Sequence, residues 1–307
     1  MNNKYMSKIL VVGDIYIEND FFVQTIPVEN EFSVANEVIT FTGSKTINSG
    51  RVMTRLGNSV DFFAKTGTDD NYLKVLSDLK KYNISIDLLV QSPDIKTGQI
   101  AVITDERERS AVNIYFGANS TVVPQDIKDL ESDISKYDMV YGATHLPLDC
   151  LYQLVDSCKR KRVPLFLDFP NPQKTVDLNK LADVDYISPN REEAEALFNE
   201  QIRSIDDAFR VLNLFRKFCK GTIILTLDID GCAVLEKGAK DPIYLQTTPI
   251  QAVDSVGAGD IFKAVFISEF LSTKNIQTAI THAQQIATRS VEIKGLDLTL
   301  NSLDLSF

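Results

Sequence analysis

The sequence predicts an α/β fold: a doubly wound, mostly parallel sheet with helices on both faces and a small β-sheet lid beside it. Short apolar runs rich in β-branched and aromatic residues end in turn formers, as strands buried on both faces of a parallel sheet do. Segments with helical periodicity separate these runs, and such alternation indicates βαβ units. Residues 15–41 and 97–117 break the alternation, because their strand-like pieces have no helix between them.

The expected strands of the main sheet are, in chain order, KILVVGDIYI, VDFFAKTG, DMVYGATH, VPLFLDF, VDYISPN and GTIILTLDIDG. The expected helices are Thr46–Leu56, Asn71–Tyr82, Gln125–Lys136, Leu148–Lys161, Arg191–Phe198 and Ile205–Cys219. Ser204 is the expected N-cap of the last of these helices, because Asp207 follows it three residues on.

The two irregular stretches, about 15–41 and 97–117, are expected to form the lid together. The segment GQIAVITDERERSAVNIYFG has the pattern of a hairpin whose turn is Asp105–Glu108. An open lid presents strand edges, which proteins usually cover, so we expect it to pair with a second copy in a two-fold homodimer. No repeat, low-complexity tract or long linker divides the chain, and residues 1–307 are expected to form a single domain.

Composition excludes several classes of protein. Of the 307 residues, 44% are hydrophobic, and the formal net charge of −10 argues against a nucleic-acid groove, which needs clustered Lys and Arg. The four cysteines form no CxxC pair and only two histidines occur, which argues against a structural zinc site and suits a reducing compartment. The N-terminal segment lacks a signal-peptide layout, and no apolar stretch reaches the ~18 residues of a membrane span. We therefore expect a cytoplasmic protein that binds neither nucleic acid nor membrane.

Residues 252–266, AVDSVGAGDIFKAVF, place small residues directly before an aspartate at a strand-to-helix junction. Gly257, Ala258 and Gly259 let backbone N–H groups approach a ligand closely, and the start of the following helix favours an anion. Asp260, beside that anion site, could accept a proton from a substrate hydroxyl while the amides hold the developing phosphoryl charge. The alternative interpretation is an ordinary strand–turn–helix junction in which Asp260 only begins the helix.

Several segments resemble those of the PfkB (ribokinase-like) carbohydrate kinases. DSVGAGDIFKA looks like the second signature of that family, and GSKTINSGRVMTRLG is similar to its first. FGAN, PNREEAEAL, LTLDIDGCAVL and ATRSVEIKG resemble further segments of the family. The resemblance covers almost the whole chain. It implies a ribokinase-like fold and an ATP-dependent kinase that phosphorylates a hydroxymethyl group of a sugar or sugar-like molecule.

The resemblance implies roles for residues on the phosphate and nucleotide side. Asp260 would be the catalytic base, and residues 257–259 would form the anion hole. Thr226 and Gly231 would lie on the nucleotide side, in the segment that resembles the strand pair of the family beside ATP.

The resemblance implies that three further residues help to bind metal cations. Asn190 and Glu193 would organise Mg²⁺ and the phosphate tail through water, because Mg²⁺ keeps several of its waters. Taken by themselves, Asn190 is typical of a turn after Pro189, and Glu193 of a solvated helix face. Asp254 would lie near a site for a monovalent cation such as K⁺, as in ribokinases, or would only cap a strand end.

The acceptor side of the site departs from the family pattern. Asn48 would bind sugar hydroxyls and Gly43 would line the acceptor site, as the resemblance implies. Tyr16 and Glu18 stand where ribokinases have Asn and Asp, and His145 stands where they have Glu before Pro. The phosphoryl-transfer residues are thus intact while the sugar floor is altered, so the substitutions reflect either a different acceptor or drift with ribose still bound.

Two other functions compete with a sugar kinase. A nucleoside kinase of the same family would need an aromatic pocket for the base. The lid could supply it or could bury the same side chains as its core; they are Tyr16, Phe21, Phe22 and Phe41. A non-catalytic protein that binds a sugar or a nucleotide is the other alternative, and the intact Asp260 argues against it.

Overall fold

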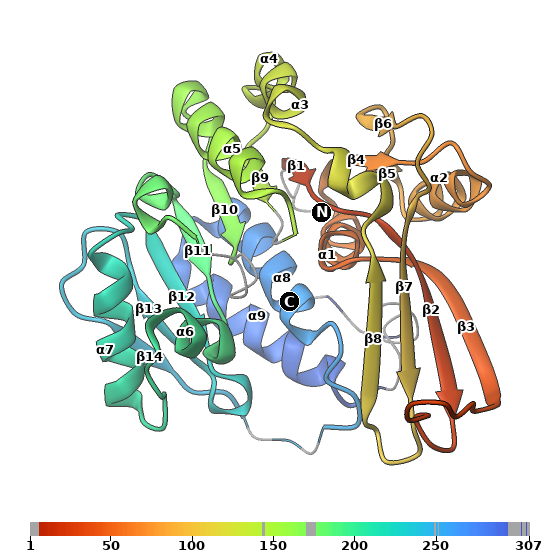
Figure 1. Cartoon of the computed structure of the whole chain (residues 1–307). Coiled ribbons are helices and arrows are strands. Elements are labelled where there is room, and N and C mark those ends of the chain that lie inside the picture. Colours follow the sequence, from red (N-terminus) through yellow and green to blue (C-terminus); the bar gives the residue numbers. More distant parts are fainter. Residues whose placement is uncertain are drawn as a thin grey trace.

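The computed structural model describes residues 6–142, 145–169, 176–248, 250, 252–293, 302 and 305. These residues form a large sheet between layers of helices, with a small sheet at one side (Figure 1). Within the described ranges, no helix is both long and apolar enough to cross a lipid bilayer. Residues 143–144 at the end of the DMVYGATH strand, and the last two residues of ATRSVEIKG, lie outside the described residues.

The described strands of the large sheet run in the order β14-β13-β12-β11-β10-β9-β1-β4-β5, and β6 also pairs with β4. All neighbours are parallel except β12–β13 and β13–β14, which are antiparallel. The strands are β1 (Lys8–Val12), β4 (Ser59–Thr66), β5 (Ile84–Ser85), β6 (Leu89–Gln91), β9 (Met139–Gly142), β10 (Leu165–Asp168), β11 (Tyr186–Ser188), β12 (Thr222–Thr226), β13 (Cys232–Leu235) and β14 (Ile243–Leu245).

Helices cover both faces of this sheet. Alternate residues of β1 enter opposite cores, because successive side chains of a strand point to opposite faces: Leu10 packs on one side and Val11 on the other. The core that holds Leu10 includes α3 (Pro124–Asp129), α4 (Glu131–Ile134), α5 (Leu148–Lys161), α6 (Arg191–Phe198) and α7 (Ile205–Arg216). The core that holds Val11 includes α1 (Lys45–Arg55), α2 (Asn71–Lys81), α8 (Ala258–Thr273) and α9 (Ile276–Ser290). Short 3₁₀ turns lie at η1 (Gly117–Thr121), η2 (Leu178–Leu181) and η3 (Asp228–Asp230).

The small sheet comes from the two stretches that break the strand–helix alternation. It is built from β2 (Tyr16–Val23), β3 (Ala35–Gly43), β7 (Gly98–Thr104) and β8 (Ser110–Tyr115), in the order β3-β2-β7-β8. The β7–β8 hairpin turns at the expected place, where the Asp105 N–H donates to the Arg109 carbonyl at 3.0 Å. The doubly wound α/β fold with a small additional sheet is confirmed.

Two elements differ from the sequence prediction. The run KILVVGDIYI is not one strand, because it divides between β1 of the large sheet and β2 of the small sheet. Both backbone groups of Ile15 bond to the side chain of Asn119, at 3.0 and 2.8 Å, so the chain leaves the ladder there and turns toward the small sheet. The expected helix Gln125–Lys136 is two short helices, and Leu130 lies at the junction between them.

Candidate active site

The GAGD segment forms the N-terminus of α8. Gly257 is the N-cap with φ of 80°, a left-handed conformation that favours glycine. A Cβ at Gly259 would meet nothing within 4 Å, so the packing of the protein does not require glycine at that position. The space beside Gly259 is therefore open to a ligand. Free N–H groups at this helix start suit an anion.

Asp260 follows in the first turn of α8 and is 6% exposed. The Asn48 side-chain amide of α1 donates to Asp260 Oδ2 at 2.9 Å, and the Ser49 hydroxyl donates to the Asp260 carbonyl at 3.1 Å. Burial raises the pKa of Asp260 to about 6, against the opposing effects of Lys263, the Asn48 hydrogen bond and Lys45. A carboxylate with a pKa near neutrality is suited to accept a proton during turnover.

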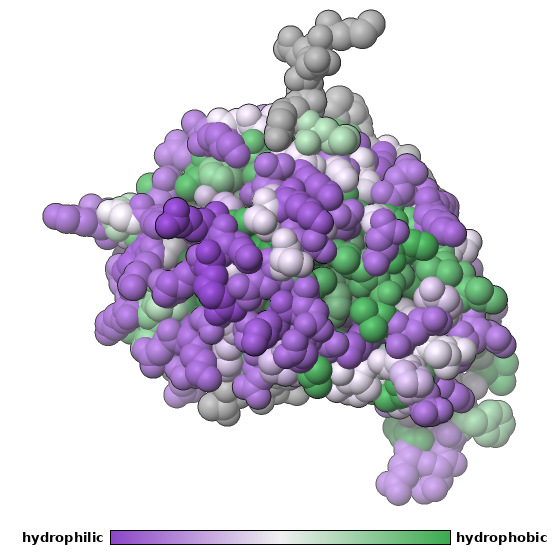
Figure 2. Space-filling view, turned by 90° about the horizontal axis from the view of Figure 1, so that it is seen from above, coloured by the Kyte–Doolittle hydropathy of each residue, from purple (hydrophilic) through white to green (hydrophobic). Residues whose placement is uncertain are grey.

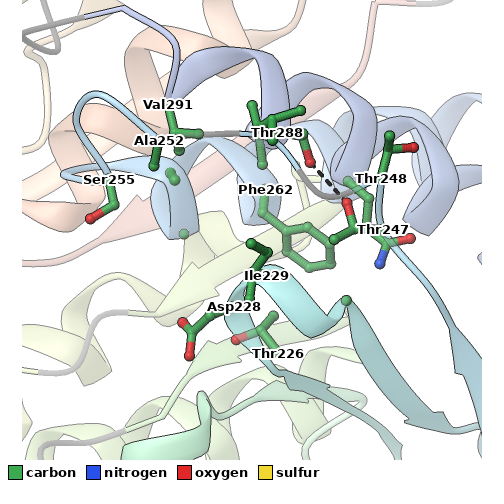
Figure 3. Close-up of a pocket in the computed structure, with 16 residues that line it drawn as sticks. Thr226, Asp228, Ile229, Thr247, Thr248, Ala252, Ser255, Phe262, Thr288 and Val291 are labelled. Atoms are coloured by element: carbon green, nitrogen blue, oxygen red, sulfur yellow. Dashed lines mark hydrogen bonds between the residues drawn. The ribbon is translucent and has the colours of Figure 1, made fainter.

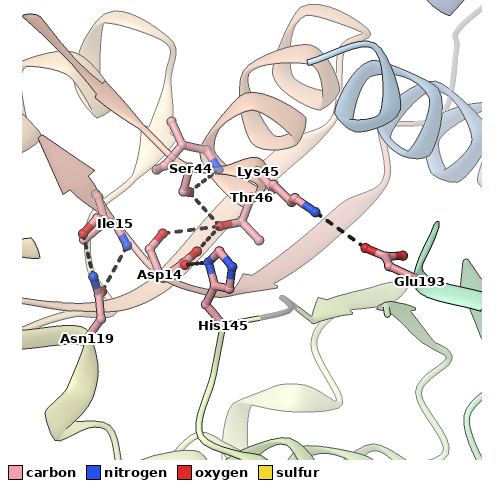
Figure 4. A network of polar contacts seen from close by, with 9 residues as sticks. Asp14, Ile15, Ser44, Lys45, Thr46, Asn119, His145 and Glu193 are labelled. Atoms are coloured by element: carbon pink, nitrogen blue, oxygen red, sulfur yellow. Dashed lines mark hydrogen bonds and ion pairs between the residues drawn. The ribbon is translucent and has the colours of Figure 1, made fainter. Parts of the chain in front are cut away.

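Two lysine–carboxylate pairs lie beside Asp260. Lys45 Nζ of α1 lies 3.8 Å from Glu193 Oε1 of α6 (Figure 4). Lys263, one turn further along α8, forms a buried ion pair with Asp168 at the end of β10. The sequence prediction named neither lysine nor Asp168. A signal existed for Lys263, which is the one charged residue in the apolar run IFKAVF.

Asn190 and Glu193 form a reciprocal cap at the start of α6. The Glu193 N–H donates to Asn190 Oδ1 at 2.7 Å, and the Asn190 N–H donates to Glu193 Oε2 at 2.9 Å. Glu193 is 6% exposed, so the interpretation as a solvated helix face is wrong. Burial, with the charge of Asp168, raises the pKa of Glu193. Glu193 Oε1, the oxygen outside the cap, is directed toward Lys45.

A cavity of about 380 Å³ opens beside the N-terminus of α8 (Figure 3). Four residues predicted from the sequence line it: Thr226, Gly231, Ala258 and Gly259. Asn190 does not line it. The other lining residues are Asp228, Ile229, Thr247, Thr248, Ile250, Ala252, Ser255, Phe262, Gln284, Ala287, Thr288 and Val291.

The cavity combines an apolar wall with a few polar groups. The Phe262 ring of α8 and the side chain of Ile229 contribute apolar surface (Figure 3). Thr247 and Thr288 share a hydrogen bond of 2.9 Å across one side. Gly231 has φ of 97°, and a Cβ there would lie 2.3 Å from the Leu245 carbonyl oxygen. The volume and lining suit a flat organic base whose attached groups reach toward α8.

A second polar cluster lies around Asp14 and His145. The carboxylate of Asp14, just after β1, pairs with His145 Nδ1 at 2.7 Å (Figure 4). Phe116 contacts His145 edge to face, with ring centroids 6.4 Å apart, and contacts Tyr16 at 6.5 Å. His145 therefore lies between a carboxylate and an aromatic wall.

Glu18 of β2 belongs to the same side of the site. Burial, with the charges of Asp20 and Asp260, raises the pKa of Glu18 to about 7. A Cβ at Gly43 would lie 2.6 Å from Glu18 Oε2, so the glycine leaves room for this carboxylate. The Asn48 side-chain oxygen is buried and has no hydrogen-bond partner among the described residues. Asn48, Gly43 and Glu18 thus come together near Asp260, whereas their role in binding an acceptor stays a prediction.

Asp254 lies in the loop before α8. Its carboxylate accepts from the Val256 N–H at 3.0 Å, and the N–H groups of Val253 and Asp254 donate to the Val291 carbonyl at 2.7 and 3.0 Å. This loop is therefore tied to the end of α9. Asp254 does not cap a strand end, because the preceding strand β14 ends at Leu245; a role in binding a cation stays a prediction.

The fold and the site define a class of protein: the phosphotransferases that use an alcohol group as acceptor. A model of the pfkB family of carbohydrate kinases matches residues 6–302, nearly the whole chain. The protein belongs to the pfkB family of carbohydrate kinases. This membership leaves the non-enzymatic alternative without support.

Named relatives agree with this family. The ribokinase of Staphylococcus aureus (strain COL) is 24% identical over 97% of this chain and 98% of its own length. The ribokinase of Bacillus subtilis (strain 168) is 26% identical over 93% of each chain. The structure of Arabidopsis thaliana ribokinase complexed with ribose and ATP is similar in fold, with a TM-score of 0.86 and 22% identity over 99% of this chain and 100% of that chain.

Proposed function

We propose that the protein transfers the γ-phosphate of ATP to a hydroxymethyl group of a small sugar or sugar-like acceptor, with Asp260 as the general base. The observation that carries the proposal is the position of Asp260. Its buried carboxylate lies in the first turn of α8, directly after Gly259 of the cavity lining, and accepts a hydrogen bond from Asn48. We infer that this base serves a nucleotide in the cavity and an acceptor near Asn48 and Glu18, whose pKa the charge of Asp260 raises.

Each residue of the site has a separate role in the proposed phosphoryl transfer. Asp260 takes the proton of the acceptor hydroxyl as its oxygen attacks the γ-phosphorus, and the bond from that phosphorus to the β-phosphate oxygen breaks. The N–H groups of residues 257–259 stabilise the negative charge on the transferred group. Asn48 holds Asp260 Oδ2 with its amide and leaves its side-chain oxygen for a hydroxyl of the acceptor. Thr226 and Gly231 line the cavity and would contact the nucleobase of ATP.

The site suits a hydrated magnesium ion. No cluster of three or more Asp, Glu, His or Cys side chains arranged to hold a metal occurs within the described ranges. Glu193 Oε1 is a carboxylate oxygen outside the cap of α6, and Mg²⁺ bound through water needs few such ligands. When bound, Mg²⁺ would neutralise charge on the phosphates. Glu193 and Asn190 would hold its waters. A monovalent cation such as K⁺ would bind beside Asp254.

The acceptor pocket favours a molecule other than ribose. Glu18 and His145 occupy the two positions at which the family pattern has Asp and Glu, and His145 pairs with Asp14. Contacts of a carboxylate with neighbouring hydroxyls depend strongly on geometry, and a mismatched acceptor leaves buried polar groups unpaired. We infer that another sugar, a sugar acid or a nucleoside has a higher kcat/KM than D-ribose.

A nucleoside acceptor has one specific observation in its favour. The rings of Tyr16, Phe116 and His145 form a continuous series of edge-to-face contacts beside the acceptor side. Tyr16 is only 1% exposed and belongs to the core, so Phe116 and His145 are the two rings of the wall that could hold a nucleobase. Phe21 and Phe22 are half-buried in β2, and Phe41 contacts the Gly43 region of the small sheet.

The small sheet is proposed to act as a lid and as the contact between two copies. Its outer strands expose large apolar side chains, among them Val38 and Val112. The Phe32 side chain in the β2–β3 connection is 89% exposed. Figure 2 shows hydrophobic surface gathered on the side where Figure 1 places the small sheet, whereas the other side is mostly hydrophilic. Apolar surface of this kind is typical of an interface, and a second copy would cover it.

The function is tested with ATP, Mg²⁺ and a panel of acceptors that includes ribose, other pentoses and hexoses, sugar acids and nucleosides, with ADP release as the readout. We expect ADP release that depends on one of these acceptors and a preference for one other than ribose. The double variant Glu18→Asp, His145→Glu is expected to move the preference toward ribose. If the unchanged protein prefers ribose to every other acceptor, the two substitutions are drift and the inference about the acceptor is wrong.

A further inference from the structure

Helix α8 carries a buried lysine that the reaction as described above does not use. Lys263 is 7% exposed, and Asp168, its partner at the end of β10, is 0% exposed. Removing two charges from water costs several kcal/mol each, and a buried pair is commonly no more stabilising than apolar residues of the same size. Stability alone therefore does not account for this pair in the core beneath the site.

The Lys263–Asp168 pair lies close to Asp260 along α8. Lys263 follows Asp260 by three positions, so both side chains lie on one face of α8. Asp168 binds the lysine through Oδ1, and its Oδ2 has no hydrogen-bond partner among the described residues. The lysine is thus held by a carboxylate that belongs to a different element and is fully enclosed. This anchor fixes a positive charge one turn from Asp260.

Most of the other charged groups around Asp260 are carboxylates, which disfavour its ionised form. Lys45 is the second nearby cation, but it is shared with Glu193 at 3.8 Å. The groups that face Asp260 from the elements packed against it are Lys45, Asn48 and Ser49 of α1, Glu18 of β2, Tyr141 of β9, Asp168 of β10 and Lys263 of α8. A buried carboxylate among other carboxylates would hold its proton at neutral pH and could not accept another.

We propose that Lys263, anchored by Asp168, is a positioning residue that keeps the Asp260 carboxylate ionised and ready to accept a proton from the acceptor. The inference rests on the proposed role of Asp260 as the base. The charge of Lys263 is the largest of the effects that lower the pKa of Asp260, and it also lowers the pKa of Glu193. Lys263 itself does not touch the acceptor or take up its proton.

The first test compares the pH dependence of kcat/KM for the protein and for Lys263→Met. Because Asp260 must be ionised, activity falls as the pH drops through its pKa. Loss of a neighbouring cation shifts such a pKa by about 1–3 units. We expect the acid limb of Lys263→Met to move up by at least about one pH unit, with recovery toward the unchanged activity at high pH. Lys128→Met, which removes an exposed lysine from α3, is the control and should leave the limb in place.

The second measurement does not need turnover. The ¹³C carboxyl resonance of Asp260, assigned by its loss in Asp260→Asn, gives the midpoint of its titration without acceptor. We expect this midpoint to rise in Lys263→Met. If Lys263→Met does not fold, the double variant Asp168→Asn, Lys263→Met removes both buried charges, and its midpoint should also rise, by less.

The outcomes separate the two proposals. An unchanged Asp260 midpoint in the lysine variants overturns the inference, as does a loss of kcat that is equal at every pH, which would indicate a structural role. A raised KM for ATP with an unchanged acid limb would show that Lys263 instead contacts the nucleotide, and this also overturns it. Normal turnover in Asp260→Asn would overturn the role of Asp260 itself, whatever Lys263 does to its titration.

Discussion

The Asp260 side chain is buried, so its ionised form destabilises the folded protein. Burial raises its pKa to about 6, so the carboxylate is ionised at pH 8 and mostly protonated at pH 5. Because this pKa is above the ordinary 3.8, the group stabilises the folded protein fully below pH 3.8, and that contribution is lost as the pH rises through about 6. The ionised carboxylate therefore lowers stability at neutral pH, which the proposed role of Asp260 as a base would account for.

Asp260→Asn should consequently stabilise the protein at high pH. An amide carries no charge to bury and can still accept the hydrogen bond from Asn48. We expect the free energy of unfolding in urea to rise by up to about 3 kcal/mol at pH 8, and by about half as much at pH 5. Asp156→Asn, an exposed change on α5, is the control and should show neither effect. An equal gain at both pH values would contradict a raised pKa for Asp260.

Glu18 gives a prediction for acceptor binding. Its pKa of about 7 means that the carboxylate form, which accepts hydrogen bonds from two neighbouring hydroxyls, dominates only above neutral pH. We expect the KM for the acceptor to fall as the pH rises from 6 to 8, and Glu18→Gln to have a higher KM at pH 8 that changes little with pH. Glu37→Gln, an exposed change on β3, should behave like the unchanged protein. A pH dependence that persists in Glu18→Gln would assign it to another group.

The sequence predicted the local structure of the GAGD motif, whereas the chemical roles of its residues stay predictions. Residues 257–260 lie together at a helix start, as the GAGD pattern indicated. Lys45, Lys263 and Asp168 were missed because their meaning depends on partners far away in the chain. Glu193 was misjudged when taken alone as a solvated residue, since only the approach of Lys45 from α1 shows why its carboxylate is enclosed.

The bend between β1 and β2 positions two residues of the proposed acceptor side, Asp14 and Tyr16. The Asn119 side chain occupies both the N–H and the carbonyl of Ile15, in place of strand partners. Asp14 and Tyr16 flank that residue, so their positions depend on a distant asparagine. The sequence placed the start of the lid at residue 15, inside the run KILVVGDIYI, but it could not reveal that a distant asparagine holds the bend.

Asn119→Ala should loosen this bend. The two Ile15 backbone groups would be left buried without partners, at a cost of about 1–3 kcal/mol each before any relaxation or entry of water. We expect a lower free energy of unfolding and a raised KM for the acceptor, with the KM for ATP nearly unchanged. Asn113→Ala, an exposed change on β8, is the matched control. If Asn119→Ala raises the KM values for ATP and acceptor equally, the bend does not act on the acceptor side alone.

At the scale of the whole molecule, the strand–helix alternation was enough to predict the layered sheet, because each buried strand must be covered on both faces. The order of the strands and the antiparallel pair at β13 and β14 were not predictable, since they depend on long-range pairing. The small sheet was predicted from the two stretches in which strand-like segments follow one another without a helix between them. The association of two copies through the exposed apolar residues of the small sheet stays a prediction.

Light scattering at micromolar concentration should give a mass near twice the 34.3 kDa of the chain. Val112→Lys places a charge on an outer strand of the small sheet, where the valine is 56% exposed, and should shift the population toward the monomer. Val123→Lys makes the same change outside the sheet, where the valine is 47% exposed, and should not. A monomeric unchanged protein would count against the proposed contact.

The most direct test of the central claim is the turnover of Asp260→Asn with the best acceptor from the panel, measured at pH 8 by coupled ADP release. If Asp260 is the general base, kcat should fall by about 10²–10⁴-fold. The affinity for ATP, measured by isothermal titration calorimetry, should change little, because the cavity and the N-terminus of α8 are preserved. An Asp260→Asn variant with an unchanged kcat would contradict the account.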